Sequence, residues 1–184
     1  MLHWHHPALY VAKSKIKGLE EGCFTNKPIN KHELIWYSED YPTVSLAQFI
    51  TLSKVNPRYS SGVQVAKDLY YSTLPDFEDS PVETMNHSCS PNVVYLGTNV
   101  MMAWKNIPKG GELYYDYGTA ETKGILPRDS SIISGCKCRS KNCRGDIRSD
   151  DYKKLIKVYG IYMQKFILKE LKFKSQYVQE YFYD

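Results

Sequence analysis

The stretch NHSCSPN, at residues 86–92, lies in the middle of the chain and decides how the rest is interpreted. Two further stretches follow it, ELYYDY at residues 112–117 and CKCRSKNCRG at residues 136–145. The first stretch alone is weak evidence for a site, because an asparagine can close a turn and a histidine can be an ordinary core residue. The three stretches together, in this order, carry the interpretation.

The bulk composition limits the possible classes of protein. The chain has 184 residues and 42% of them are hydrophobic, which suffices for one domain with a real core and small appendages. Its net charge of +4 is too small to indicate a nucleic-acid-binding protein. No run of 18 apolar residues is present, so we expect no membrane-spanning helix and no membrane partner. Residues 1–7 lack the features of a signal peptide and predict a loose terminus.

Hydrophobic periodicity predicts a mainly β protein with small helices. The expected strands are 8–12, 34–37, 93–96, 100–104 and 112–115, with one or two more inside 55–80. A capping-box pattern at 45–48 predicts a short helix at 46–54. A long loop is expected at 119–135, and apolar residues at spacings of three and four predict an amphipathic helix from Asp150 through Ile167.

Five cysteines are present, and four of them fall inside the quoted stretches. Without an export signal, clustered cysteines indicate a metal site rather than disulfides, and they indicate a reducing, intracellular compartment, nucleus or cytoplasm. Cys136, Cys138 and Cys143 place three thiols within eight residues, and zinc prefers four ligands in a tetrahedron. The alternatives are free or redox-active thiols, or a zinc knuckle that binds nucleic acid.

Taken together, the three stretches resemble the signatures of the SET-domain protein lysine methyltransferases. Residues 86–92 match the NHSCxPN box, residues 112–117 the ELxxDY box, and residues 136–145 the CxCxxxxCRG of the post-SET zinc segment. The resemblance covers residues 8–150 and implies a SET β-clip fold with a pseudoknot. The implied divisions are a SET domain at 1–118 with a variable insert at 42–80, a post-SET zinc segment at 119–150 and a C-terminal helical extension at 151–184.

The resemblance also implies a set of site residues. S-adenosylmethionine is expected to contact Gly22, Cys23, Phe24, Asn86, His87 and Tyr117. Cys89 is expected to complete a structural zinc site with Cys136, Cys138 and Cys143. Tyr115 and Tyr117 match the positions of the family's catalytic tyrosines.

The implied reaction is methyl transfer from a sulfonium to a lysine amine of a protein, and it needs no metal. The nucleophile is the neutral amine, and its pKa near 10.4 makes deprotonation at neutral pH cost roughly 4–5 kcal/mol. A dry channel and the adjacent sulfonium both favour the neutral form. The hydroxyl of Tyr117 is expected to orient the amine, and a tyrosine at 115 leaves little room for a methylated product. Mono- or di-methylation is therefore expected.

This sequence departs from the family pattern at three places. Glu20-Glu21 lengthens the gap between Gly18 and the Gly22 turn, His32 replaces a glycine, and Glu83 stands where the family often has an arginine. These departures keep a second interpretation open, a catalytically silent SET domain that binds a peptide or partner. The expected partner in the main interpretation is a protein carrying the target lysine, with a histone tail as one candidate, and nucleic acid is not required.

Overall fold

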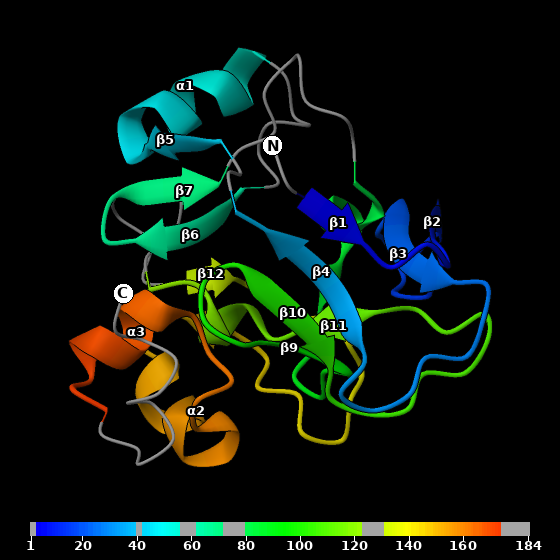
Figure 1. The fold of residues 1–184 in the computed structure, drawn as a ribbon. Coiled ribbons are helices and arrows are strands. Elements are labelled where there is room, and N and C mark those ends of the chain that lie inside the picture. The colour runs from blue at the N-terminus through cyan, green and yellow to red at the C-terminus, as the bar shows by residue number, and fades with distance from the viewer. Residues whose placement is uncertain (1–2, 40–41, 56–61, 72–79, 123–130, 174–184) are drawn as a thin grey trace.

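The computed structural model describes residues 3–39, 42–55, 62–71, 80–122 and 131–173, and Figure 1 draws the other segments as a thin grey trace. Short strands dominate, and the expectation of a mainly β protein with small helices is confirmed. The strands are β1 His3–His5, β2 Leu9–Lys13, β3 Glu21–Thr25, β4 Leu34–Ser38, β5 Thr43–Ser45, β6 Val63–Ala66, β7 Leu69–Tyr71, β8 Asn86–His87, β9 Val93–Tyr95, β10 Val100–Ala103, β11 Tyr114–Tyr115, β12 Ser131–Ile133 and β13 Ile147–Arg148. The helices are α1 Leu46–Val55, α2 Tyr152–Tyr159 and α3 Lys165–Glu170, with short 3-10 turns η2 Pro81–Thr84 and η3 Tyr117–Thr119.

The largest sheet has the order β1-β4-β10-β9 and is antiparallel throughout. Its hairpin β9–β10 is the one that the Gly97-Thr98-Asn99 turn predicted, and Gly97 has a φ of +74°. Ile35, Met101 and Val93 are fully buried and place the main core against this sheet. The N-terminal segment was expected to be loose, but β1 pairs with β4 and His3 lies opposite Ser38. The additional strand partner explains why this prediction was wrong.

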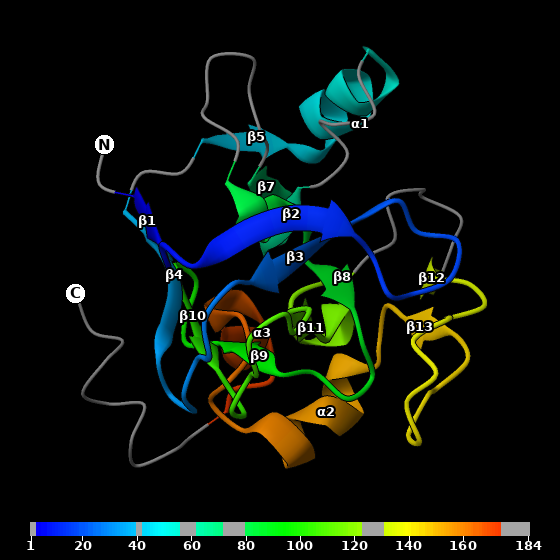
Figure 2. The same cartoon turned by 90° about the vertical axis from the view of Figure 1, so that its right-hand side faces the viewer.

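A second antiparallel pair, β2–β3, crosses in front of the main sheet in the view of Figure 2. Behind it, β8 and β11 form a short parallel pair, in which Asn86 lies opposite Tyr114 and His87 opposite Tyr115. Figure 2 shows these two strands side by side in the centre of the molecule. The parallel pairing brings the two quoted stretches into contact although 20 residues or more separate them in the chain.

The insert forms a separate small sheet with the order β5-β7-β6, which α1 covers at the upper left of Figure 1. The capping box is confirmed, because the Ser45 hydroxyl accepts from the Gln48 N–H at 3.3 Å and Gln48 Oε1 accepts from the Ser45 N–H at 2.9 Å. Phe49 then stacks on Tyr70 with ring centroids 5.0 Å apart. The predicted helix and the predicted short strands of the insert are thus present.

The C-terminal region differs from the single long helix that the periodicity predicted. Two short helices are present, and α2 ends at Gly160, whose φ is +56°. Both helices pack on a second core around Met163 and Ile167, so the apolar periodicity is satisfied without helical continuity. The predicted loop 119–135 also contains β12, which pairs with β13. The tyrosine-rich tail from Gln176 lies outside the described residues.

His32, the residue that replaces a glycine of the family, has a φ of +70°. This left-handed conformation suits glycine and strains a residue with a Cβ. The turn therefore keeps the glycine-like geometry in spite of the substitution. None of the helices in the described parts of the chain is long and apolar enough to cross a membrane.

Candidate functional site

The site is built where β8 and β11 run in parallel, and the side chain of Asn92 fixes the pair. Asn92 Oδ1 accepts from the Tyr114 N–H at 2.7 Å, and its amide donates to the Glu112 carbonyl at 2.8 Å. The Ser88 N–H donates to the Tyr115 carbonyl at 3.0 Å. The last residue of the first stretch thus holds the backbone of the second stretch in register.

Three tyrosine rings follow one another through this region. Tyr115 packs on Tyr117 with centroids 4.7 Å apart and meets Tyr95 edge-on at 5.6 Å. The Tyr117 hydroxyl donates to the Met85 carbonyl at 3.2 Å. Burial raises the pKa of all three phenols well above the usual value, so all three are neutral at physiological pH. The two tyrosines that the sequence singled out therefore lie together.

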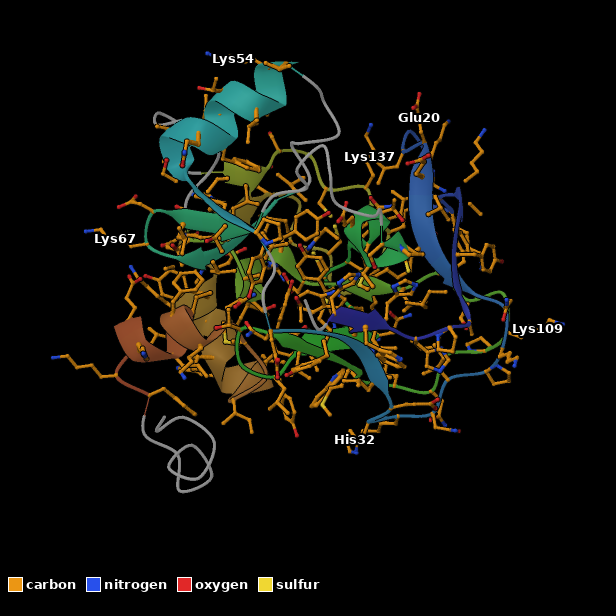
Figure 3. The ribbon with its side chains drawn as sticks, turned by 45° about the horizontal axis from the view of Figure 1, so that its top comes forward. Glu20, His32, Lys54, Lys67, Lys109 and Lys137 are labelled. Atoms are coloured by element: carbon orange, nitrogen blue, oxygen red, sulfur yellow. The ribbon has the colours of Figure 1, made fainter. Side chains whose placement is uncertain are left out.

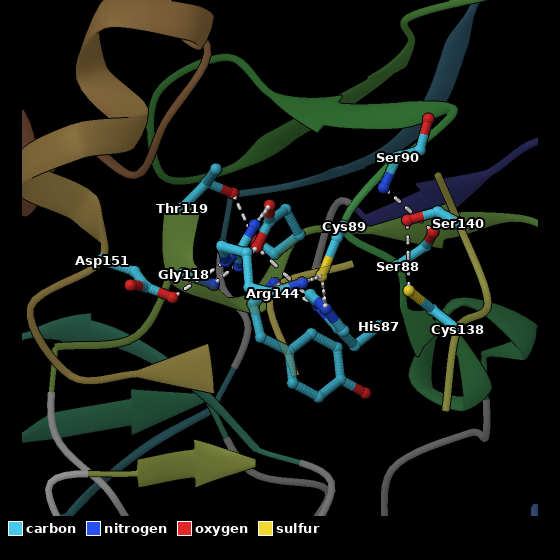
Figure 4. Close-up of polar contacts among 12 residues, drawn as sticks. His87, Ser88, Cys89, Ser90, Gly118, Thr119, Cys138, Ser140, Arg144 and Asp151 are labelled. Carbon is cyan, nitrogen blue, oxygen red and sulfur yellow. Dashed lines mark hydrogen bonds and ion pairs between the residues drawn. The ribbon is translucent and has the colours of Figure 1, made fainter. Parts of the chain in front are cut away.

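His87 is buried and neutral. Burial lowers its pKa to about 4, although the nearby Asp116 carboxylate opposes the shift. The Tyr117 N–H donates to His87 Nδ1 at 3.1 Å, so the proton of the neutral ring must be on Nε2. Nε2 lies 3.2 Å from the Cys89 sulfur and donates to it. His87 thus links the tyrosine segment to the cysteine cluster, as Figure 4 shows.

Ligand atoms of His87, Cys89, Cys136 and Cys138 all lie within 4.8 Å of one another. The stretch 136–145 therefore does reach the first stretch, as expected. Cys143 is outside that group, but its thiol lies beside Cys136, and its sulfur is 3.7 Å from the Cys136 carbonyl oxygen. Soft sulfur donors at this spacing fit a tetrahedral zinc ion, whose bonds to sulfur are about 2.3 Å long.

The cysteine thiols differ in acidity. Burial raises the pKa of Cys136 to about 11 and that of Cys89 further. Burial also acts on Cys138, but hydrogen bonds from Ser140 and neighbouring groups outweigh it and bring its pKa down to about 6. Cys138 is thus the thiol that most readily supplies a thiolate to a metal.

Arg144 was not expected from the sequence as a site residue, although it directly follows Cys143. It forms two hydrogen bonds with the Asp116 carboxylate, both of 2.7 Å, and a third with Asp151 at 2.9 Å. The Asp116 side chain is fully buried, and its Oδ1 also accepts from the Gly118 N–H at 3.0 Å. Figure 4 shows Arg144 between Asp151 and the His87–Cys89 pair. Arg144 therefore connects the stretch 136–145 to the stretch 112–117 and to the start of α2.

The stretch Gly22-Cys23-Phe24 lies in β3 and borders a polar network. A Cβ at Gly22 would collide with the Glu112 carboxylate, so the glycine permits their close approach. Cys23 is fully buried, and burial raises the pKa of its thiol to about 12, so the thiol is neutral and inert. The Asn86 amide donates to the Glu21 carbonyl at 2.7 Å, which places Asn86 beside this strand.

Glu112 is the centre of that network and was missed as a site residue. Its buried carboxylate accepts hydrogen bonds of 2.7 Å from the Ser14 hydroxyl, the Lys15 N–H and the Tyr114 hydroxyl. Glu112 is the first residue of the stretch ELYYDY, and this position could have marked it as a site residue. The network ties the N-terminal turn to β11.

The turn at 14–20 also meets the post-SET stretch. A Cβ at Gly18 would lie 3.2 Å from the Lys137 ammonium nitrogen. Figure 3 shows Lys137 and Glu20 on the same side of the molecule, with Lys109 and His32 directed outward elsewhere. The extra residues Glu20-Glu21 are accommodated because Glu21 begins β3 and pairs with Lys13.

A cofactor with a cationic sulfonium fits the chemistry of this region. The Tyr117 hydroxyl oxygen and the Met85 carbonyl oxygen are 3.2 Å apart and both offer lone pairs. Asn86 follows Met85 directly and supplies further polar groups. Oxygen lone pairs beside neutral aromatic rings stabilise a positive charge.

Comparison with known proteins gives a family match. A family model described as SET domain matches residues 20–118. Over 75 aligned positions, which cover 33% of this chain and 11% of the other protein, the chain is 41% identical to the Arabidopsis thaliana histone-lysine N-methyltransferase, H3 lysine-9 specific SUVH3. Over 137 aligned positions, which cover 54% of this chain and 41% of the other protein, the chain is 26% identical to the histone-lysine N-methyltransferase, H3 lysine-9 specific dim-5 of Neurospora crassa.

The chain thus spans between about a tenth and two fifths of the length of the curated relatives it matches. Among solved structures, a humanized mutant of the Chaetomium thermophilum Polycomb Repressive Complex 2 bound to the inhibitor GSK343 matches with a TM-score of 0.48 and 17% identity. That match covers 60% of this chain and 15% of the other chain.

Proposed function

Because the chain belongs to the SET-domain family, we propose that it is an S-adenosylmethionine-dependent methyltransferase acting on a lysine side chain of a protein. The observation that carries the proposal is the contact between the first two stretches. The Tyr117 N–H donates to His87 Nδ1 at 3.1 Å, and the Tyr117 hydroxyl donates to the Met85 carbonyl at 3.2 Å. The stretch 86–92 and the tyrosines of the stretch 112–117 therefore border the same small polar region.

In this proposal the cofactor supplies a methyl group on a positively charged sulfur. Gly22, Cys23 and Phe24 of β3, together with Asn86, His87 and Tyr117, would hold it. The side chains of Cys23 and His87 are buried, so their part would be played through the backbone. Asn86 is half-buried and is already oriented by its bond to Glu21.

The tyrosines would act on the target amine. The Tyr117 hydroxyl is a neutral donor and acceptor, and it orients the amine so that its lone pair points at the methyl group. Tyr115 is 7% exposed and narrows the space around that amine. A hydroxyl there leaves less room for added methyl groups, which supports mono- or di-methylation.

The zinc site would consist of Cys89, Cys136, Cys138 and Cys143. His87 belongs to the same compact group, but its Nε2 carries the ring proton and cannot ligate. His87 would instead donate that proton in a hydrogen bond to the Cys89 thiolate, as outer groups often do for metal ligands. The ion would fasten the segment 136–145 onto the site, so its binding energy would be partly folding energy.

The relatives that are named as H3 lysine-9 specific support a histone H3 tail as the substrate to test first. The same proposal divides the chain into a SET domain at 1–118, a post-SET zinc segment at 119–150 and a C-terminal helical extension at 151–184. Arg144 bonds to Asp116 of the first division, so the segment 119–150 would complete the site instead of forming a separate unit.

The experiment that tests the proposal has two steps. Calorimetric titration of the zinc-loaded protein with S-adenosylmethionine should give binding in the micromolar range. Incubation with histone H3 and other lysine-rich proteins should then give a mass increase of one or two methyl groups on a lysine. Absence of both cofactor binding and methyl transfer, with the fold intact, would contradict the proposal. Binding without transfer on any substrate would favour a silent domain.

A further inference from the structure

Glu121 is a buried carboxylate in the segment that directly follows the tyrosines, and its backbone N–H donates to the Tyr117 carbonyl at 2.8 Å. It lies four residues after Tyr117, just past η3, and is 8% exposed. Its Oε1 accepts from the backbone N–H of Gln64 in β6 at 3.0 Å. Gln64 Oε1 in turn accepts from the N–H of Thr122 at 2.8 Å and from its hydroxyl at 3.1 Å. These bonds join the small sheet β5-β7-β6 to the segment that follows the stretch 112–117.

The charge of Glu121 acts on phenols from four elements. Its charge contributes to raising the pKa of Tyr70 in β7, Tyr95 in β9, Tyr115 in β11 and Tyr117 in η3, in each case after burial as the larger cause. These tyrosines are neutral at physiological pH. Glu121 takes part in none of the ion pairs found among the described residues. Burial without a cation raises its own pKa to about 8, although the Gln64 N–H opposes the shift.

Gln164 adds an independent observation on the other side of Tyr95. It directly precedes α3 and is fully buried, and its backbone N–H donates to the Thr119 carbonyl at 3.0 Å. Its amide acts on the Tyr95 phenol and lowers the pKa of that group against the larger effect of burial. Neither amide atom has a hydrogen-bond partner of good geometry among the described residues. An unpaired buried amide is costly, and such groups often mark a place where a ligand binds.

We propose that Glu121 receives the side-chain ammonium group of the target lysine, as the acidic residue next to the buried cluster formed by Tyr95, Tyr115, Tyr117 and Gln164. The proposal rests on the proposed function. The ligand class is a primary alkylammonium. Such a cation would pair with the Glu121 carboxylate, would find further acceptors in the phenol oxygens and Gln164 Oε1, and would lie against aromatic faces that favour positive charge.

The hydrogen bond between residue 121 and the Gln64 N–H does not by itself require a carboxylate. A glutamine at 121 could accept from the Gln64 N–H in the same way without placing an ionisable group in the core. A buried acid without a cation destabilises the fold, so its presence calls for a reason other than stability. Binding of a cation supplies one.

The same residue can dispose of the proton that the nucleophile must lose. In the buried pair, the Nζ–H bond breaks and an O–H bond forms on the carboxylate, which leaves a neutral amine and a neutral carboxyl. The lone pair of Nζ is then free to form the N–CH₃ bond, while the electrons of the S–CH₃ bond remain on sulfur. The low polarity of the surroundings favours the two neutral groups over two charges.

The test uses n-butylammonium chloride, which reproduces the end of a lysine side chain, and the full zinc-loaded chain. Carbon-13 NMR of labelled glutamate carboxyls follows the titration, and the signal absent from the E121Q variant identifies Glu121. The matched control is Thr122→Val, which removes a hydroxyl from the same joint but keeps the carboxylate. Wild type and T122V should bind equally, and Glu121→Gln should bind at least ten-fold more weakly.

The pH dependence provides a second readout that a merely structural role would not produce. Wild-type affinity should rise as the pH rises through about 8, where Glu121 ionises. Affinity should fall again near pH 10.4, where the amine loses its charge. The glutamine variant should lack the rise in affinity near pH 8. Equal affinity in wild type and E121Q, or no butylammonium binding to wild type, would overturn the inference.

Methyl transfer measured on the same three proteins separates this inference from the proposed function. If wild type binds butylammonium through Glu121 but methylates no protein, the proposed function is contradicted and the amine site stands. If wild type methylates a lysine and E121Q does so with an unchanged kcat/KM and pH profile, the role of Glu121 is contradicted and the proposed function stands.

Discussion

The guanidinium of Arg144 donates two hydrogen bonds to the carboxylate of Asp116, from Nη1 to Oδ2 at 2.7 Å and from Nη2 to Oδ1 at 2.7 Å. Asp116 lies between the two tyrosines of the site, and Arg144 directly follows Cys143. Asp116 Oδ1 also caps η3 through the Gly118 N–H. A bidentate pair of this kind fixes orientation as well as distance. The position of Tyr117 is thus coupled to the cysteine segment.

Replacement of Arg144 by glutamine should destabilise the protein by about 3–5 kcal/mol, because the buried Asp116 charge would lose its partner. Urea unfolding at neutral pH measures the loss. Lys141→Gln, at an exposed position in the same stretch, is the control and should change the stability by less than about 0.5 kcal/mol. An Arg144 variant as stable as wild type would show that water replaces the guanidinium.

Serine at position 138 or 143 should abolish stoichiometric zinc binding, because each change removes a thiolate from the proposed ligand set. His87→Gln should retain the zinc, since a glutamine amide can still donate to the Cys89 sulfur. Metal analysis of the purified proteins by mass spectrometry gives the stoichiometry. Full zinc in C143S together with loss in H87Q would reverse the assignment and make His87 the fourth ligand.

Removal of the Tyr117 hydroxyl by Tyr117→Phe should reduce methyl transfer by at least about 100-fold, because the amine loses the group that orients it. The affinity for S-adenosylmethionine should stay within a few-fold, since the main-chain bond to His87 remains. Single-turnover transfer and calorimetry measure the two quantities. Tyr162→Phe, at a half-buried ring that packs on Trp104 in the second core, is the control. Retained turnover in Y117F would rule out the assigned role.

Removal of the Tyr115 hydroxyl should shift the products toward more highly methylated lysine. The phenylalanine leaves space where the hydroxyl stood, on a ring that packs against Tyr95 and Tyr117. Mass spectrometry of the product distribution at matched turnover tests this expectation. An unchanged ratio of methylation states would mean that another group limits the space around the amine.

The variant Glu121→Gln should be more stable than wild type at pH 8 and equally stable near pH 4.5. The folded pKa is raised from 4.5 to about 8, so the folded state holds a proton that the unfolded chain has lost in this window. The contribution of Glu121 to the stability of the wild type is therefore greatest below pH 4.5 and is lost progressively up to about pH 8. Thermal unfolding across this range measures it. Parallel curves for the two proteins would contradict the raised pKa.

Several features followed from the sequence because they depend on neighbours along the chain. The capping box of Ser45 and Gln48 closes within four residues, and the hairpin of β9 and β10 turns at Gly97. Local hydrogen bonds and a single permissive glycine decide such elements. The order of the three quoted stretches indicated the family in the same way, since each motif is a short run of adjacent residues.

Other features needed the folded chain. Asp116 and Arg144 are 28 residues apart, and Gln64 and Glu121 are 57 residues apart. No periodicity connects such pairs, because their contact depends on how β8, β11 and the insert sheet cross. The pairing of β1 and the division of the C-terminal helix at Gly160 were missed for the same reason.

The sequence by itself therefore determined the mainly β class, the family and the residues to inspect, because these are encoded in short patterns of adjacent side chains. The tertiary structure alone decided which of those residues meet. It placed His87 as a hydrogen-bond donor to Cys89, and it brought Arg144 to Asp116 and Glu121 to Tyr117, neither of which the sequence had indicated. Burial then set their charges, because desolvation acts only once the chain has closed around them.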